Sequence, residues 1–421
     1  MPWTLARSAA FLVIAGLLLA ATTAPPLTVA LGPAAPSFDE SSSSNETSSS
    51  DAGSKKNVAF LPLIAQSFRP VPPAHLGYGA NVASADHVTI LTEMGFDWAK
   101  GYVSWENAGF GPGYDWVVVD NQMREFVPHL RHVLLRLGGP PPPGIGNPPA
   151  SANDRAAFQS FAQALAAHVA DTWRDQGLQT VAYEIWNEPN LDYEWGGRPN
   201  AAQYTSLLQS GYRGIKAGDP EAIVVSAGLA PTGGSLANVA WARAFYAAPQ
   251  VIPDLTFLRG MYENGAKGYF DALGSHPYGG PDAPGTAPGA ASGPIYFRRA
   301  EEQRQVMLDY GDTSPVWATE FGWVLDTGCG LGEHEWMEVS EAQQAQYLAG
   351  AYAYADAHWP WMGPMFMFNL DFGTTYWYAW CDPVRWYAIT HRADPKDPGN
   401  SPILYRQAVF SLRSLAKRSA W

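Results

Sequence analysis

The sequence predicts an α/β protein whose eight strand–helix units close into a (β/α)8 TIM barrel. Short apolar stretches recur from His75 onward, and most are followed by a loop and then by a segment with helical spacing of apolar residues. The connections are short, as expected where helices join parallel strands. An open doubly wound sheet is the alternative, but no glycine-rich phosphate loop follows the first predicted strand. The 421 residues suffice for one large barrel.

The predicted strands are rich in apolar, β-branched and aromatic residues and end at polar residues, glycine or proline. In chain order we expect them over Gly77–Asn81, Phe96–Ser104, His132–Leu137, Val181–Trp186, Ala222–Ser226, Tyr269–Ser275, Val316–Thr319 and Met365–Leu370.

The predicted helices carry apolar residues on one face, as Phe158, Phe161, Leu165 and Val169 show. Ser340 is a candidate N-cap for one of them. We expect helices over Ser84–Met94, Trp116–Pro128, Asn153–Arg174, Ala201–Lys216, Tyr296–Tyr310, Glu341–His358 and Leu404–Leu415, with none assigned between the fifth and sixth strands.

The N-terminal part predicts export. Residues 1–24 resemble a secretory signal peptide, with Arg7 before the apolar run Phe11–Ala21, and residues 25–56 form a serine-rich linker before the barrel at 57–421. An uncleaved membrane anchor is the alternative. Pro25 and Pro26 argue against one continuous helix, so we expect a secreted protein without stable membrane insertion after cleavage.

Composition excludes one class of partner and permits another. The net charge of −13 and the lack of a basic run argue against nucleic acid, whose phosphates require clustered Lys and Arg. The 17 tryptophans and 20 tyrosines offer flat faces that suit sugar rings, although most should lie in the core. Cys329 and Cys381 fall in the loops after the seventh and eighth strands, so we expect them to form a disulfide in an exported protein.

Two glutamates end predicted strands. In Tyr183–Asn190, YEIWNEPN, Pro189 stops strand pairing and leaves Glu188 at the carboxyl end of the strand. In Pro315–Trp323, PVWATEFGW, Glu320 lies at the end of the seventh strand. Ligands in such folds bind at the carboxyl ends of the strands, where two carboxylates can act as acid and nucleophile. The alternative is that Glu188 merely caps the next helix.

The W-N-E-P-N and T-E-F-G motifs resemble clan A of the glycoside hydrolases, and family 39 most closely. The resemblance covers roughly His75–Trp421. It implies that Glu188 is the general acid/base, Asn187 holds a sugar hydroxyl and Glu320 is the nucleophile. It also implies a polysaccharide or oligosaccharide substrate with β-linked sugars, and it requires no cofactor.

The clan also places an aromatic residue or histidine at the end of the sixth strand, close to the nucleophile. Here His276 and Tyr278 occupy that place. The resemblance therefore implies that Tyr278 donates its hydroxyl hydrogen to Glu320 and that His276 lines the sugar site. A loop histidine without a role is the alternative for His276.

Five further residues are candidates for substrate binding. Trp105 is a candidate sugar platform and Lys100 a candidate hydroxyl donor, with core packing or an ion pair as alternatives. Arg136 interrupts an apolar strand and needs a carboxylate partner if buried. Asn190 and Trp195 follow the acid/base and are candidates for the wall of a neighbouring subsite.

Strand eight departs from the clan, which usually places a tryptophan under the reacting sugar. Here the strand ends in Asn369–Phe372, and Trp377 and Trp380 come later. The run Glu333–Glu335 has one histidine between two carboxylates, which is too weak a pattern to assign a metal.

We therefore expect a secreted retaining glycosidase. A non-catalytic sugar-binding barrel and a transglycosylase are the alternatives. The presence of both carboxylates argues against the first alternative, while the sequence does not separate hydrolysis from transglycosylation.

Overall fold

The computed structural model describes residues 77–109, 113–232, 251–326, 328, 332–394 and 401–417. The signal peptide predicted at 1–24, the linker at 25–56 and Cys329 lie outside these residues. Cys381 has no free thiol, and its pairing with Cys329 stays a prediction. Within the described part of the chain, no helix is both long and apolar enough to cross a membrane.

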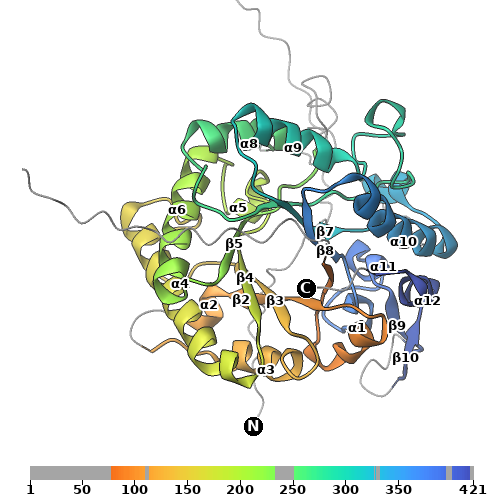
Figure 1. The fold of residues 1–421 in the computed structure, drawn as a ribbon, viewed down its shortest axis with the longest axis horizontal. Coiled ribbons are helices and arrows are strands. Elements are labelled where there is room, and N and C mark those ends of the chain that lie inside the picture. Colours follow the sequence, from red (N-terminus) through yellow and green to blue (C-terminus); the bar gives the residue numbers. More distant parts are fainter. Residues whose placement is uncertain are drawn as a thin grey trace, which may run out of the picture. The chain divides into compact units, whose positions relative to one another are not determined.

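Eight parallel strands form the barrel, in the ring order β5-β4-β3-β2-β1-β8-β7-β6 (Figure 1). The ring closes between β5 and β6, where Val225 pairs with Ala272 and the Ser226 N–H donates to the Ala272 carbonyl at 3.1 Å. The strands are β1 Tyr78–Asn81, β2 Trp98–Ser104, β3 His132–Gly138, β4 Thr180–Ile185, β5 Ile223–Ser226, β6 Leu273–Ser275, β7 Val316–Phe321 and β8 Met362–Met367. The predicted (β/α)8 fold is confirmed.

Helices lie around the strands, as Figure 1 shows for α4, α6, α8 and α9. Reciprocal capping boxes start two of them, with Ser151 and Asp154 at α4 and Ser340 and Gln343 at α10. The α-helices are α1 Thr89–Glu93, α2 Trp105–Ala108, α3 Val117–Phe126, α4 Ala152–Trp173, α5 Asp192–Trp195, α6 Ala201–Gly218, α8 Asp254–Glu263, α9 Arg299–Asp309, α10 Glu341–His358, α11 Pro383–Tyr387 and α12 Gln407–Ser414. Short 3-10 turns are η1 Ala85–His87, η2 Arg174–Gln176, η4 Pro288–Ala290, η5 Gly332–Met337 and η6 Phe372–Thr374.

Two of the differences from the sequence prediction concern α8 and the last helix. Helix α8 was missed, although Phe257, Leu258, Met261 and Tyr262 are buried at helical spacing along it. The helix predicted from Leu404 is wrong at its start. There the chain forms an antiparallel hairpin of β9 Thr390–Arg392 and β10 Ile403–Tyr405 before α12 begins.

The inside of the barrel changes character along its axis. Toward the amino ends of the strands it is filled by an apolar cluster, and Gly79 of β1 makes room for it, since a Cβ there would lie 2.6 Å from the Phe366 ring. The cluster contains Trp98, Leu134, Ala182, Val225, Ala272, Trp317 and Phe366. Side chains two residues apart point to the same face of a strand, so the next inward positions are Lys100, Arg136 and Glu184. A charged layer therefore lies above an apolar floor.

Candidate active site

The charged layer is built by strand periodicity and register. Arg136 is the register neighbour of Tyr102 on β2 and of Glu184 on β4. Lys100 and Glu184 are fully buried, and Arg136 is 5% exposed. Burying such charges is costly unless they are paired, so this layer must contain its own counter-charges.

Glu188 lies directly after β4 on a constrained turn. Trp186 and Glu188 both have positive φ angles, of 75° and 36°, which is uncommon for residues with a side chain and frequent at functional sites. The Glu188 N–H donates to the Gly228 carbonyl at 3.1 Å, and the Trp186 indole donates to the Glu194 carbonyl at 2.9 Å. These bonds fix the turn that presents Glu188 to the barrel mouth.

Glu320 lies within β7, where the pairing with β8 shifts register between Ala318 and Phe321. Such an irregularity re-aims a side chain. The Tyr278 hydroxyl donates to Glu320 Oε2 at 2.7 Å, and Lys100 Nζ lies 3.2 Å from Oε1. The carboxylate is fully buried and held at both oxygens.

The two carboxylates meet around His276. One oxygen of Glu188, one oxygen of Glu320 and a ring nitrogen of His276 lie within 4.8 Å of one another. His276 Nδ1 is 2.8 Å from Glu188 Oε1 and 3.7 Å from Glu320 Oε2. The structure thus brings together both carboxylates, His276 and Tyr278 from the sequence prediction, although His276 contacts the predicted acid instead of simply lining a sugar site.

The charges of the cluster set its protonation. Burial alone would raise the pKa of Glu320, but the charges of His276 and Lys100 outweigh it and lower the pKa. Burial alone would lower the pKa of His276, but the charge of Glu320 and the nearby carboxylates of Glu184 and Glu188 raise it to about 9. At neutral pH Glu320 is therefore ionised, and His276 carries a proton on each nitrogen and donates to Glu188.

Glu184 is a site residue that the sequence reading missed. Its Oε2 lies 2.7 Å from Lys100 Nζ, and its Oε1 accepts the Gly228 N–H at 3.1 Å and lies 3.7 Å from His276 Nε2. Burial would raise its pKa, but Lys100 and His276 lower it far below the ordinary value. The available signal was its position two residues after the inward-facing Ala182.

Asn187 and Glu194 follow β4 and adjoin the cluster. Asn187 is 4% exposed, and its amide makes no hydrogen bond within the described residues, although it lies close enough to Glu194 to affect that carboxyl. Desolvation and the charge of Glu188 raise the pKa of Glu194 to about 7, against the effect of Arg136. The sequence reading did not single out Glu194.

The guanidinium carbon of Arg136 lies 4.7 Å from the centre of the Tyr102 ring. The ion pair predicted for Arg136 stays a prediction. The Tyr102 hydroxyl in turn donates to Asn81 Oδ1 at 2.7 Å. Burial would lower the pKa of Arg136, but Tyr102 and the carboxylates of Glu194, Glu320 and Glu184 raise it. Arg136 therefore contributes positive charge to the site.

Three predicted binding residues belong to the scaffold instead. Trp105 is fully buried with its ring centre 5.1 Å from that of Phe158, because its side chain turns outward to the helices. Trp195 is also fully buried and packs edge-on against Trp186. Asn190 hydrogen-bonds in both directions to the backbone after β5. These positions correct the predicted platform and subsite-wall roles. Lys100 likewise binds carboxylates in place of the predicted sugar hydroxyl.

The cluster has the donor atoms of a metal site, but these atoms are already engaged by hydrogen bonds, an ion pair or a proton. Glu188, His276 and Glu320 could offer three ligand atoms. However, Lys100 and Tyr278 already occupy the Glu320 oxygens, and His276 would have to lose a proton to bind a metal. This donor set fits acid–base chemistry better. The side chains of Glu333 and His334 lie outside the described part.

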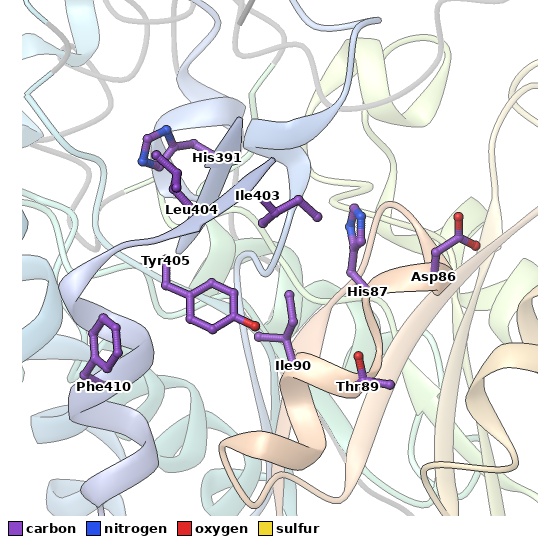
Figure 2. Close-up of a pocket in the computed structure, with 9 residues that line it drawn as sticks. All are labelled: Asp86, His87, Thr89, Ile90, His391, Ile403, Leu404, Tyr405 and Phe410. Atoms are coloured by element: carbon purple, nitrogen blue, oxygen red, sulfur yellow. The ribbon is translucent and has the colours of Figure 1, made fainter. Parts of the chain in front are cut away.

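A separate pocket lies between α1, the β9–β10 hairpin and α12 (Figure 2). None of the carboxylates of the cluster lines it. Its lining combines the apolar side chains of Ile90, Ile403, Leu404, Tyr405 and Phe410 with the polar ones of Asp86, His87, Thr89 and His391. Nothing in its chemistry connects it with the paired carboxylates, so the barrel mouth remains the candidate active site.

Fold and site together define a (β/α)8 barrel with two carboxylates at the carboxyl ends of β4 and β7. No family model and no curated protein matches the chain. Among solved structures, a monomeric β-xylosidase from Caulobacter crescentus CB15 matches over 81% of this chain and 67% of its own, at 16% identity and a TM-score of 0.54.

Two further solved structures are similar. A GH39 enzyme from Xanthomonas axonopodis pv. citri matches over 81% of this chain and 65% of its own, at 15% identity and a TM-score of 0.53. The GH53 catalytic domain of Ignisphaera aggregans matches over 82% and 97%, at 15% identity and a TM-score of 0.52. At these identities the likeness establishes the fold, which is that of family 39 and other clan A glycoside hydrolases, as the motifs predicted.

Proposed function

We propose that this protein is a secreted retaining glycoside hydrolase that cleaves β-linked glycosidic bonds in a polysaccharide or oligosaccharide. The observation that carries the proposal is the paired carboxylates, with oxygens of Glu188 and Glu320 within 4.8 Å. Retaining enzymes hold their two carboxyl groups about 5–5.5 Å apart, whereas inverting enzymes need about 6.5–9.5 Å to admit a water. The close approach of their nearest oxygens favours the shorter of these two arrangements and therefore double displacement.

In the first step, an oxygen of ionised Glu320 forms a bond to the anomeric carbon. The bond from that carbon to the leaving oxygen breaks, and this oxygen takes the proton of Glu188. His276 donates to Oε1 of Glu188, which leaves the proton on Oε2 for the leaving group. Asn187, with its unpartnered amide, is placed to bind a hydroxyl of the same sugar.

In the second step, water attacks the anomeric carbon of the glycosyl–Glu320 ester. Glu188, now a carboxylate, takes a proton from this water, and the ester bond breaks to regenerate Glu320. Lys100 and Tyr278 contact the two oxygens of Glu320 and stabilise the carboxylate as it leaves. The site returns to its starting protonation, so the two steps balance.

Exposed aromatic side chains after β8 support a substrate longer than one sugar. Tyr376, Trp377 and Trp380 are 79%, 54% and 50% exposed, and exposed apolar patches of this kind mark binding surfaces. The neighbouring Tyr378 packs in the same buried cluster as Tyr278 and Tyr387, so this loop adjoins the site. The predicted signal peptide supports action outside the cell.

The test is a screen of purified protein on β-linked polysaccharides, oligosaccharides and aryl glycosides, including β-xylosides because two structural neighbours are β-xylosidases. We expect cleavage, and NMR of early products should show the β-anomer first. The Glu188→Gln/Glu320→Gln double variant controls for contaminating enzymes. An α-anomer as first product would refute retention, and no cleavage of any substrate would favour a binding barrel.

We expect activity to fall on the alkaline side with a midpoint near pH 9, because His276 then loses the proton that it donates to Glu188. The pKa of His276 in the folded protein is raised above the ordinary 6.5. Its stabilising effect is therefore complete below pH 6.5 and is lost as pH rises through about 9. The kcat/KM profile and thermal unfolding across pH check this. His276→Gln should abolish both changes, and an unaltered alkaline limb in that variant would contradict the assignment.

A further inference from the structure

We propose that Glu184 is a positioning residue. It holds Lys100 against the nucleophile Glu320, and it keeps His276 in the protonated state that orients the acid Glu188. The catalytic effect of this role rests on the proposed function, whereas the contacts that define the role do not. Glu184 touches neither the bond that breaks nor the bond that forms. Its contacts, however, link both catalytic carboxylates to one buried charge.

Glu184 stands at the centre of two chains of contacts. Through Oε2 it lies 2.7 Å from Lys100 Nζ, which lies 3.2 Å from Glu320 Oε1. Through Oε1 it lies 3.7 Å from His276 Nε2, while Nδ1 of the same ring lies 2.8 Å from Glu188 Oε1. Glu184 thus supports the contact of Lys100 with Glu320 and the contact of His276 with Glu188.

The position of Glu184 is fixed by the backbone around it. The Gly228 N–H donates to Oε1 at 3.1 Å. Gly228 has no space for a side chain, because a Cβ there would lie 2.1 Å from His276 Cδ2. The close approach lets the segment after β5 hold Glu184 and pack against His276 at once, so the carboxylate has little freedom to move.

The charge count shows why a third carboxylate is needed. When Glu188 carries the proton that it donates, the inner cluster contains two cations, Lys100 and protonated His276. Glu320 balances only one of them, and Glu184 balances the other. Without Glu184 the buried cluster would have an excess positive charge, which low-dielectric surroundings penalise strongly. His276 would then release its proton more easily.

The other groups whose charge acts on this cluster do not replace Glu184. Arg136 adds positive charge. The hydroxyls of Tyr278 and Tyr387 are neutral and supply no negative charge that would stabilise protonated His276. The titratable or charged groups around the cluster are Lys100 from β2, Arg136 from β3, Glu184 and Glu188 from β4 and its turn, Glu194 from α5, Tyr278 after β6, Glu320 from β7 and Tyr387 from α11. Glu194 acts on Glu188 and Arg136 and does not take the place of Glu184 between Lys100 and His276.

The test is Glu184→Gln, which keeps the shape and removes the charge. NMR titration of the His276 ring should show its pKa lowered by about 1 unit or more. The alkaline limb of kcat/KM should shift down by the same amount, and kcat should fall about 100-fold with little change in KM, as misplaced catalytic groups do. An unchanged His276 titration, or an unchanged kcat, in a folded variant would overturn the proposal.

The matched control is Asp254→Asn. Asp254 is also fully buried and forms an ion pair with Arg299 at 2.7 Å, on α8 and α9 outside the cluster. Removing its charge should lower the unfolding temperature but leave the His276 titration and the pH profile in place. If the control moved both as Glu184→Gln does, the effect would be general destabilisation and the proposal would fail.

A second variant and a readout that does not depend on activity keep the test decisive. If Glu184→Gln does not fold, Glu184→Asp keeps the charge on a shorter arm; the His276 titration should then stay high while kcat falls, and an unchanged kcat would refute the role. The NMR readout needs no activity. If the wild type cleaved no glycoside, the proposed function would fail, while the coupling of Glu184 to His276 would still be decided.

Discussion

Glu188→Ala should stop turnover of a dinitrophenyl glycoside after the first step, and azide should restore it. The dinitrophenolate leaves without protonation, so Glu320 can still form the glycosyl ester. Without Glu188 no base activates water, and the ester accumulates. Azide is already an anion and attacks without a base. On substrates whose leaving group needs a proton, we expect a loss of about 10²–10⁴-fold, the usual contribution of general acid–base catalysis. Burst kinetics and NMR of a β-glycosyl azide check this.

Glu194→Ala is the discriminating control. The carboxyl of Glu194 lies near Glu188, and its pKa of about 7 would suit an acid. However, Glu188 has the contact with His276 at 2.8 Å and the oxygen within 4.8 Å of Glu320. We expect no azide rescue in Glu194→Ala. Rescue of that variant together with an unresponsive Glu188→Ala would assign the acid/base role to Glu194.

The carboxylate pair could be predicted from sequence because strand ends carry a local signal. Glu188 and Pro189 follow shortly after β4, which ends at Ile185, and Gly322 directly follows the end of β7 near Glu320. Since parallel strands present their carboxyl ends at one face, two such signals imply proximity even though the residues are far apart in the chain. The place of Tyr278 just after β6 follows the same rule, but its contact with Glu320 was implied by the family resemblance.

Glu184 was missed because it lies inside a strand that reads as apolar. The side-chain period of two would have placed it in the layer of Lys100 and Arg136, but only once the inward face of each strand was known. The strands of a parallel barrel are buried on both faces, so alternation along one strand does not show that face. Register between neighbouring strands supplies it, and the sequence does not state the register.

Trp105 shows the opposite error. An aromatic residue directly after a strand was predicted to face a sugar, yet it is the first residue of α2 and packs between the barrel and α4. A short helix at the end of β2 turns the side chain away from the mouth. Four-residue helices such as α2 and α5 have too few residues for a periodic pattern, so their direction depends on tertiary packing.

Glu320→Ala should show the largest loss, on the order of 10⁶-fold in kcat as for removal of other catalytic nucleophiles, on every substrate including activated ones. Leaving-group ability cannot compensate here, because no group remains to attack the anomeric carbon. The deletion leaves a space bordered by the Lys100 ammonium and the Tyr278 hydroxyl, which lay 3.2 Å and 2.7 Å from the missing oxygens. A positive charge and a hydrogen-bond donor suit a small anion. Azide should therefore bind there and attack a β-linked activated substrate from the face opposite the leaving group, giving the α-glycosyl azide.

Tyr278→Phe is the matched control, since it retains the nucleophile and loses one hydrogen bond. It should lose far less activity and form no azide adduct of inverted configuration. A β-azide from Glu320→Ala, combined with an α-azide from Glu188→Ala, would mean that the two glutamates have exchanged roles.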